Sequence, residues 1–169
     1  MIETIRFILS GLVLAIIQTM VIKEVNLAWW IKPMPYVYFF FLIPISANRF
    51  GVLVGSFFFG LTLDFLGGSM GMHSAACVSI AFIKNIIDRY FVNENSLQLQ
   101  GFQCVNEQYK GWKWYYLYCL SIILAHHIIF FSLDYFRWSA IFTVISISII
   151  SAIATIFFMQ IFRYLVGKK

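Results

Sequence analysis

Residues 51–83 read GVLVGSFFFGLTLDFLGGSMGMHSAACVSIAFI, and Asp64 is their only Asp, Glu, Lys or Arg residue. At about 1.5 Å per residue, one straight helix of this length would extend about 50 Å, whereas the hydrocarbon core of a bilayer is about 30 Å thick. The glycine-rich run Gly67-Gly68-Ser69-Met70-Gly71 supplies a turn. The stretch therefore predicts a tight hairpin of two apolar helices.

The position of Asp64 indicates that this hairpin has a sunken turn. Fifteen residue steps separate Arg49 from Asp64, which corresponds to about 22 Å of helix. An ionised carboxylate at such a depth costs on the order of 2.5–3.5 kcal/mol unless it is paired, hydrated or protonated. We therefore expect Asp64 to have a specific structural or functional role.

Small residues line one face of the first helix of this hairpin. Ser56, Gly60 and Asp64 recur at every fourth position, and Gly51 and Gly55 form a second pair with the same spacing. Small side chains allow another helix backbone to approach closely, which promotes association inside lipid. The face has two interpretations: packing against the next span of the same chain, or contact with another membrane protein.

The composition excludes a water-soluble globule. Of the 169 residues, 62% are hydrophobic and 11% charged, whereas soluble domains carry about 25% charged residues. The three cysteines form no CxxC pair and predict neither a disulfide framework nor a zinc site. No cofactor is expected.

Charged residues divide the chain into six apolar stretches. They predict an all-α integral membrane protein, a compact bundle of six transmembrane helices of which some are short or re-entrant, in one domain covering residues 1–169. Pro44 is expected to kink the second span. Residues 88–111 are predicted to be a cytoplasmic polar loop. The predicted spans are 5–22, 34–48, 50–65, 70–87, 113–133 and 138–162.

The distribution of basic residues predicts the orientation of these spans. With six spans, nine Lys and Arg residues lie on the side of the N-terminus and three, Lys23, Lys32 and Arg137, on the other side. Cytoplasmic loops carry the excess of basic residues. Both termini are therefore predicted to be cytoplasmic.

Several further polar residues fall in or near the predicted outer half of the bundle. His73 follows Gly71 closely, so it lies near the same turn as Asp64, while His126 and His127 precede Asp134 in the fifth span. Adjacent histidines diverge by about 100° on a helix, which is a poor arrangement for two ligands of one metal. A hydrogen-bonded polar cluster that locks the bundle is the preferred interpretation.

These residues resemble a pattern of the MreD family, small multi-span proteins of the bacterial rod-elongation machinery. The family pattern places small residues before a Gly, an Asp four residues later, a short Gly/Ser turn, and a further Gly before a polar residue. The matching positions here are Ser56, Gly60, Asp64, Gly68, Ser69, Gly71 and His73, with the His126-His127 pair and Asp134 further on.

The resemblance implies a non-enzymatic subunit of the bacterial cytoplasmic membrane. It implies binding to the bitopic protein MreC and, through it, coupling of MreB filaments to the polymerase RodA and a class B penicillin-binding protein during peptidoglycan synthesis.

Two other functional classes are compatible with some of these residues. MreD also resembles the vitamin-binding S-components of energy-coupling-factor transporters, so a solute-binding subunit that uses His73 and His127 is the alternative. A membrane enzyme would need an acid pair such as Asp64 and Asp134, but the surrounding motifs of known intramembrane hydrolases are missing.

Overall fold

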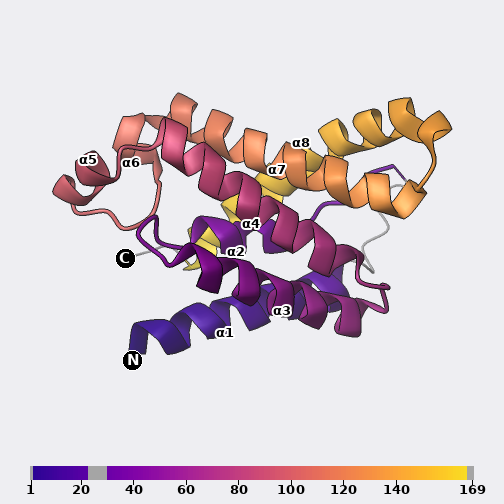
Figure 1. Cartoon of the computed structure of the whole chain (residues 1–169), viewed down its shortest axis with the longest axis horizontal. Helices are drawn as coiled ribbons and strands as arrows, with labels where there is room; N and C mark the ends of the chain where they lie inside the picture. Colours follow the sequence, from indigo (N-terminus) through magenta and orange to yellow (C-terminus); the bar gives the residue numbers. More distant parts are fainter. Residues whose placement is uncertain (1, 23–29, 167–169) are drawn as a thin grey trace.

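The computed structural model describes residues 2–22 and 30–166, and within these ranges the chain is helical and forms no strand (Figure 1). Two short helices, α5 and α6, lie at one end of the molecule, where α1 begins, and the turn between α7 and α8 lies at the opposite end (Figure 1). The helices are α1 Ile2–Ile17, α2 Tyr38–Phe41, α3 Arg49–Gly67, α4 Met72–Phe91, α5 Glu94–Leu99, α6 Glu107–Lys110, α7 Trp112–Tyr135 and α8 Ile141–Val166, with a π-helical turn at Gln18–Ile22 and 3-10 turns at Pro35–Val37 and Trp138–Ala140.

Among the described residues, three helices are long and apolar enough to cross a membrane: Arg49–Gly67, Trp112–Tyr135 and Trp138–Tyr164. They carry large apolar side chains on their outer surfaces; Phe65 is 87% exposed and Phe142 is 81% exposed. Such exposure of aromatic side chains is unfavourable in water and favourable in lipid. The chain is therefore a helical membrane protein, as the composition predicts.

The predicted hairpin is present as α3 and α4. Gly68 and Gly71 adopt positive φ angles of 68° and 82°, which residues with a Cβ rarely tolerate. The backbone N–H of Ser69 donates to the carbonyl of Asp64 at 3.0 Å and closes the end of α3. The glycine-rich run therefore reverses the chain, as expected from its composition.

The segment 34–48 does not form the predicted second helix. It contains only the 3-10 turn Pro35–Val37 and the four-residue α2, followed by turns up to Asn48. Pro33, Pro35 and Pro44 lack the N–H that a helix needs and restrict the residues before them. An apolar stretch that is long enough for a helical span therefore forms a mostly irregular segment.

Together with the residues that precede it, this stretch forms an irregular segment, residues 30–48, that runs the length of the bundle. At one end, the ammonium group of Lys32 lies 3.2 Å from the Asp134 carboxylate near the end of α7. At the other end, the carbonyl of Leu42 accepts from the Cys104 thiol at 3.3 Å and Ile45 N–H donates to the carbonyl of Gln103 at 3.1 Å. The segment therefore connects the α7–α8 turn with the region of α5 and α6.

Hydroxyl groups of α8 accept hydrogen bonds from this irregular backbone. Ser151 Oγ accepts from Lys32 N–H at 3.0 Å, and Thr155 Oγ1 accepts from Met34 N–H at 2.9 Å. In the same segment, Tyr36 and Phe40 are completely buried. Irregular backbone is tolerated at membrane depth only where protein or water satisfies it, and here α8 supplies the partners.

The polar loop predicted at 88–111 is more ordered than expected. Helix α4 continues to Phe91, and α5 and α6 follow, with Asn93 and Asn106 accepting N-cap hydrogen bonds from the backbone. Glu107 forms a two-point ion pair with Arg163 of α8, at 2.5 and 2.8 Å. The loop is thus attached to the C-terminal helix through side chains that local sequence patterns do not connect.

Candidate functional site

Asp64 lies at the centre of a hydrogen-bond network that closes the α3–α4 hairpin. Its Oδ1 accepts from Ser69 Oγ at 2.6 Å and from His73 N–H at 3.0 Å. Its Oδ2 accepts from Ser74 N–H at 2.9 Å and Ser74 Oγ at 2.5 Å. A carboxylate has about four acceptor sites, so donors of the same chain fill the hydrogen-bonding capacity of Asp64.

The face that includes Ser56 and Gly60 is also occupied from within the chain. A Cβ built on Gly60 would lie 2.7 Å from His73 O and from Ser74 N, and closer still to Ser74 Cα. Ser56 is 2% exposed, and its hydroxyl donates to the carbonyl of Val52 at 2.6 Å. Gly60 and Asp64 therefore pack against α4, as the interpretation of packing within the chain predicts, whereas Ser56 lies in the wall of the neighbouring groove.

His73 lies at the beginning of α4, two residues after the exposed turn residue Gly71. Its ring stacks on Tyr36 at 5.4 Å between centroids and meets the edge of Phe130 at 4.7 Å. Its Nδ1 is 3.8 Å from Asp64 Oδ1 and has no hydrogen-bond partner among the described residues. His73 therefore lies close to Asp64, as the sequence predicts. The hydrogen bond to the Asp64 carboxylate comes from the backbone N–H of His73 and not from its ring.

His126 and His127 face different neighbours, as expected for adjacent residues of one helix. His126 Nε2 is hydrogen-bonded to Tyr36 Oη at 2.8 Å. His127 Nδ1 lies 2.9 Å from the carbonyl of Ile123, and its Nε2 lies 3.1 Å from Thr155 Oγ1. Because a carbonyl only accepts, Nδ1 of His127 carries its proton, and both nitrogens of this ring are engaged within the chain.

Asp134 is not part of this cluster. It pairs with Lys32, and the two side chains are 30% and 44% exposed. The residue lies nearly two helical turns beyond His127, at the end of α7, so it lies too far along the helix to bond the histidines. The prediction that both acids and all three histidines form one cluster is therefore wrong for Asp134.

Sequence reasoning missed the residues that join the polar groups. Tyr36 connects His73 to His126 through a ring stack and a hydrogen bond, although it lies in the segment predicted to be the kinked second span. A second buried group joins Lys84 Nζ to Asp88 Oδ2 at 2.6 Å and Asp88 Oδ1 to Tyr118 Oη at 2.5 Å. The four-residue spacing of Lys84 and Asp88 on a helix was the available signal for the second group.

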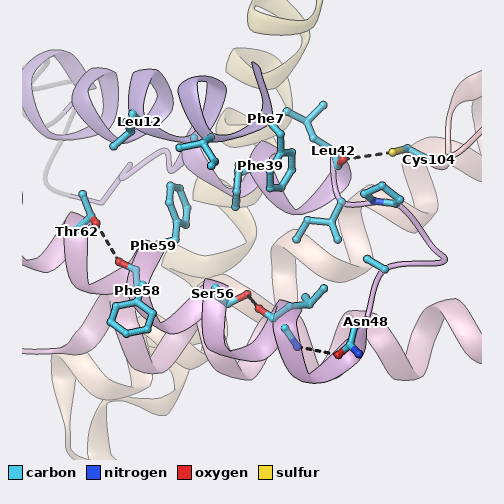
Figure 2. Close-up of a pocket in the computed structure, with 18 of the residues that line it drawn as sticks. Phe7, Leu12, Phe39, Leu42, Asn48, Ser56, Phe58, Phe59, Thr62 and Cys104 are labelled. Carbon is cyan, nitrogen blue, oxygen red and sulfur yellow. Dashed lines mark hydrogen bonds between the residues drawn. The ribbon is translucent and has the colours of Figure 1, made fainter. Parts of the chain in front are cut away.

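An open groove lies between α1 and α3, next to the packed hairpin (Figure 2). It encloses a cavity of about 860 Å³. Phe39 and Phe59 form part of its wall and stack on each other at 4.4 Å between centroids. On the α3 side, Gly51 and Gly55 line the cavity, and a Cβ built on Gly55 meets no atom within 4 Å apart from its chain neighbours and the backbone of its own helix. The second small-residue pair of α3 is thus uncovered, in contrast to Gly60.

Comparisons of the chain with protein-family models, with curated proteins and with solved structures find no match. The function is therefore inferred from the residues and their geometry. The polar cluster closes the hairpin and attaches it to α7 and α8, whereas the groove of α1 and α3 leaves a surface that a further molecule can cover.

Proposed function

We propose that this chain is a non-catalytic scaffold of the bacterial cytoplasmic membrane that binds the transmembrane helix of a bitopic partner in the α1–α3 groove. By its resemblance to MreD, the partner is an MreC-like protein of the rod-elongation complex, which acts with MreB filaments, RodA and a class B penicillin-binding protein. The observation that carries the proposal is the uncovered Gly51/Gly55 pair, because it offers a close-approach surface that this chain does not use itself.

The length of the groove favours a helix as its occupant. Its wall on the α3 side extends from Asn48 to Thr62, which is 14 residue steps or about 21 Å of helix. Helices in lipid associate through packing of small residues rather than through hydrophobicity. A partner helix that lies along α3 would gain backbone contacts at Gly51 and Gly55 and side-chain contacts with the exposed Phe58.

The proposal includes six crossings with both termini in the cytoplasm. The crossings are α1 with its π-helical turn, the irregular segment 30–48, α3, α4, α7 and α8. In this arrangement the irregular segment takes the place of the second helix, and the hydroxyls of Ser151 and Thr155 satisfy backbone groups that lipid would leave unpaired. The region of α5 and α6 then lies on the cytoplasmic side.

The solute-binding alternative has less support from the contacts. His127 was one of its proposed ligands, but the side chain is fully buried and both ring nitrogens face groups of the same chain. A buried, fully engaged imidazole offers no hydrogen bond to a solute without rearrangement.

The test replaces Gly55 by Leu and measures co-purification with the MreC-like protein of the native host. Apart from its chain neighbours and the backbone of its own helix, no atom lies within 4 Å of a Cβ at Gly55, so we expect the folded chain to tolerate the larger side chain while the groove is filled. We expect capture of the partner to fall at least tenfold, with rod-shaped cells becoming round.

The matched control is Ser146→Leu, which adds the same side chain at an exposed position of α8. Its capture of the partner is expected to equal that of the wild type. Equal capture by Gly55→Leu and Ser146→Leu would remove the groove from the proposal, and normal cell shape after depletion of the whole protein would remove the elongation function.

A further inference from the structure

A second cavity lies between α7 and α8 where the two helices meet at their turn. It has a volume of about 570 Å³. Ile128 and Leu133 line it from α7, and Ile141 and Val144 line it from α8. Unlike the α1–α3 groove, it presents bulky branched side chains, which keep the backbone of another helix at a distance.

One basic residue lies in the wall of this apolar cavity. Arg137 belongs to the turn between the helices, lines the cavity and is exposed. Its guanidinium makes no hydrogen bond or ion pair with any described residue. A guanidinium binds phosphate oxygens through two parallel hydrogen bonds, so the cavity combines a site for hydrocarbon with a site for phosphate.

The nearby acid does not cancel this charge. Asp134 precedes Arg137 by three residues, but its carboxylate is paired with the ammonium group of Lys32 at 3.2 Å. Lys32, Asp134 and Arg137 together carry a formal charge of +1. The charge at the turn is therefore complementary to an anionic head group.

The turn also positions aromatic side chains typical of a membrane interface. Phe136 has a φ of 42°, and its N–H donates to the carbonyl of Ser132 at 3.0 Å, so the chain reverses there without glycine. Phe136 and Trp138 are 83% and 91% exposed. Tryptophan rings such as that of Trp138 are enriched at the level of the lipid head groups, which is the level at which Arg137 would meet a phosphate.

We infer that the α7–α8 cavity binds one anionic phospholipid, with an acyl chain between the branched residues and the phosphodiester on Arg137. This inference depends on the membrane location of the turn and is independent of the α1–α3 groove. It assigns a ligand to Arg137, one of the three basic residues predicted to lie on the side opposite the cytoplasm.

Trp138 lines the cavity and provides a reporter for the test. The full-length protein is reconstituted in phosphatidylcholine vesicles containing increasing fractions of phosphatidylglycerol with brominated acyl chains, which quench nearby indoles. Subtracting the signal of Trp138→Phe isolates the contribution of Trp138. We expect half-maximal quenching at about fivefold lower lipid fraction with brominated phosphatidylglycerol than with brominated phosphatidylcholine, the effect of about one basic side chain at a lipid surface.

Two variants separate the two parts of the site. Arg137→Gln is expected to abolish the preference for phosphatidylglycerol, whereas Arg89→Gln, which removes an exposed arginine of α4 outside the cavity, retains it. Ser132→Leu adds bulk at an exposed position that lines the cavity and is expected to weaken quenching by both lipids.

Equal quenching by the two lipids in the wild type, or an unchanged preference in Arg137→Gln, would overturn the inference. Loss of the preference on addition of inorganic phosphate would overturn it as well, because the site would then bind a free anion and not a lipid. Native mass spectrometry of the wild type and Arg137→Gln gives a second readout, with retained phosphatidylglycerol expected only in the wild type.

Discussion

The hydroxyl of Thr155 accepts a hydrogen bond from the backbone nitrogen of Met34 at 2.9 Å, across 121 residues of sequence. The same hydroxyl contacts His127 at 3.1 Å and the carbonyl of Ser151 at 2.7 Å. It therefore joins the irregular segment, α7 and α8 at one buried point.

Replacing Thr155 by Val is expected to destabilise the protein by about 1–3 kcal/mol, because Met34 N–H loses its acceptor in a buried environment. Thr155→Ser retains the hydroxyl and should recover most of this loss. Thermal unfolding in detergent measures the difference. Thr143→Val at an exposed position of the same helix is the control, and an equal effect of both Val variants would contradict the assigned role.

Gly60 and Gly55 are expected to respond in opposite ways to alanine. A Cβ at Gly60 meets the backbone of His73 and Ser74, so Gly60→Ala should cost about 1–3 kcal/mol through overpacking. Gly55→Ala meets open space and should leave stability unchanged or raise it slightly, since Ala favours the helix. Unfolding midpoints of the two variants, measured in the same detergent, provide the comparison.

Asp64→Asn preserves the size of the side chain and removes acceptor capacity. The amide nitrogen would face donors that now bond the carboxylate, so we expect a loss of at least about 2 kcal/mol. Asp134→Asn breaks an exposed ion pair and should cost less than about 1 kcal/mol. Similar losses for both variants would show that the Asp64 network does not hold the hairpin.

The ion pair of Glu107 and Arg163 predicts a dependence on pH at the end of the molecule near α5 and α6. The Arg163 guanidinium lowers the pKa of Glu107, assisted by the Tyr116 hydroxyl and opposed by burial. A carboxyl group with a lowered pKa stabilises the folded state above its unfolded pKa of about 4.3 and loses this contribution as pH falls through the folded-state pKa.

The stability difference between wild type and Glu107→Gln should therefore be greatest near neutral pH and decrease below about pH 4.3. It should not exceed about 1 kcal/mol, because both partners are partly exposed. Chemical unfolding at a series of pH values measures the difference. A difference that stays constant down to pH 3 would contradict this assignment.

Several features followed from local sequence because their causes are local. The composition alone indicates that lipid, and not water, surrounds most of the chain. The α3–α4 turn depends on glycines that accept positive φ angles, and the four-residue spacing of Ser56, Gly60 and Asp64 places them on one face of any helix. None of these conclusions required knowledge of a distant residue.

Other features depended on contacts between distant segments. The apolar stretch 34–48 has the length of a span, but its proline residues prevent a continuous helix and hydroxyls of α8 satisfy its backbone instead. The loop 88–111 is attached to α8 by the ion pair between Glu107 and Arg163. Asp134 is paired with Lys32 and not with a histidine. Hydrogen-bond partners more than 50 residues apart leave no periodic signal in the sequence.

From its residues alone, the chain is determined to be a helical membrane protein with a glycine-turned hairpin, because hydrophobicity and backbone freedom belong to each residue separately. Which small-residue face is covered was decided only by the tertiary structure. Gly60 and Gly55 each belong to a pair of small residues with four-residue spacing, but α4 packs on Gly60, and α1 stays far enough from α3 to leave Gly51 and Gly55 open.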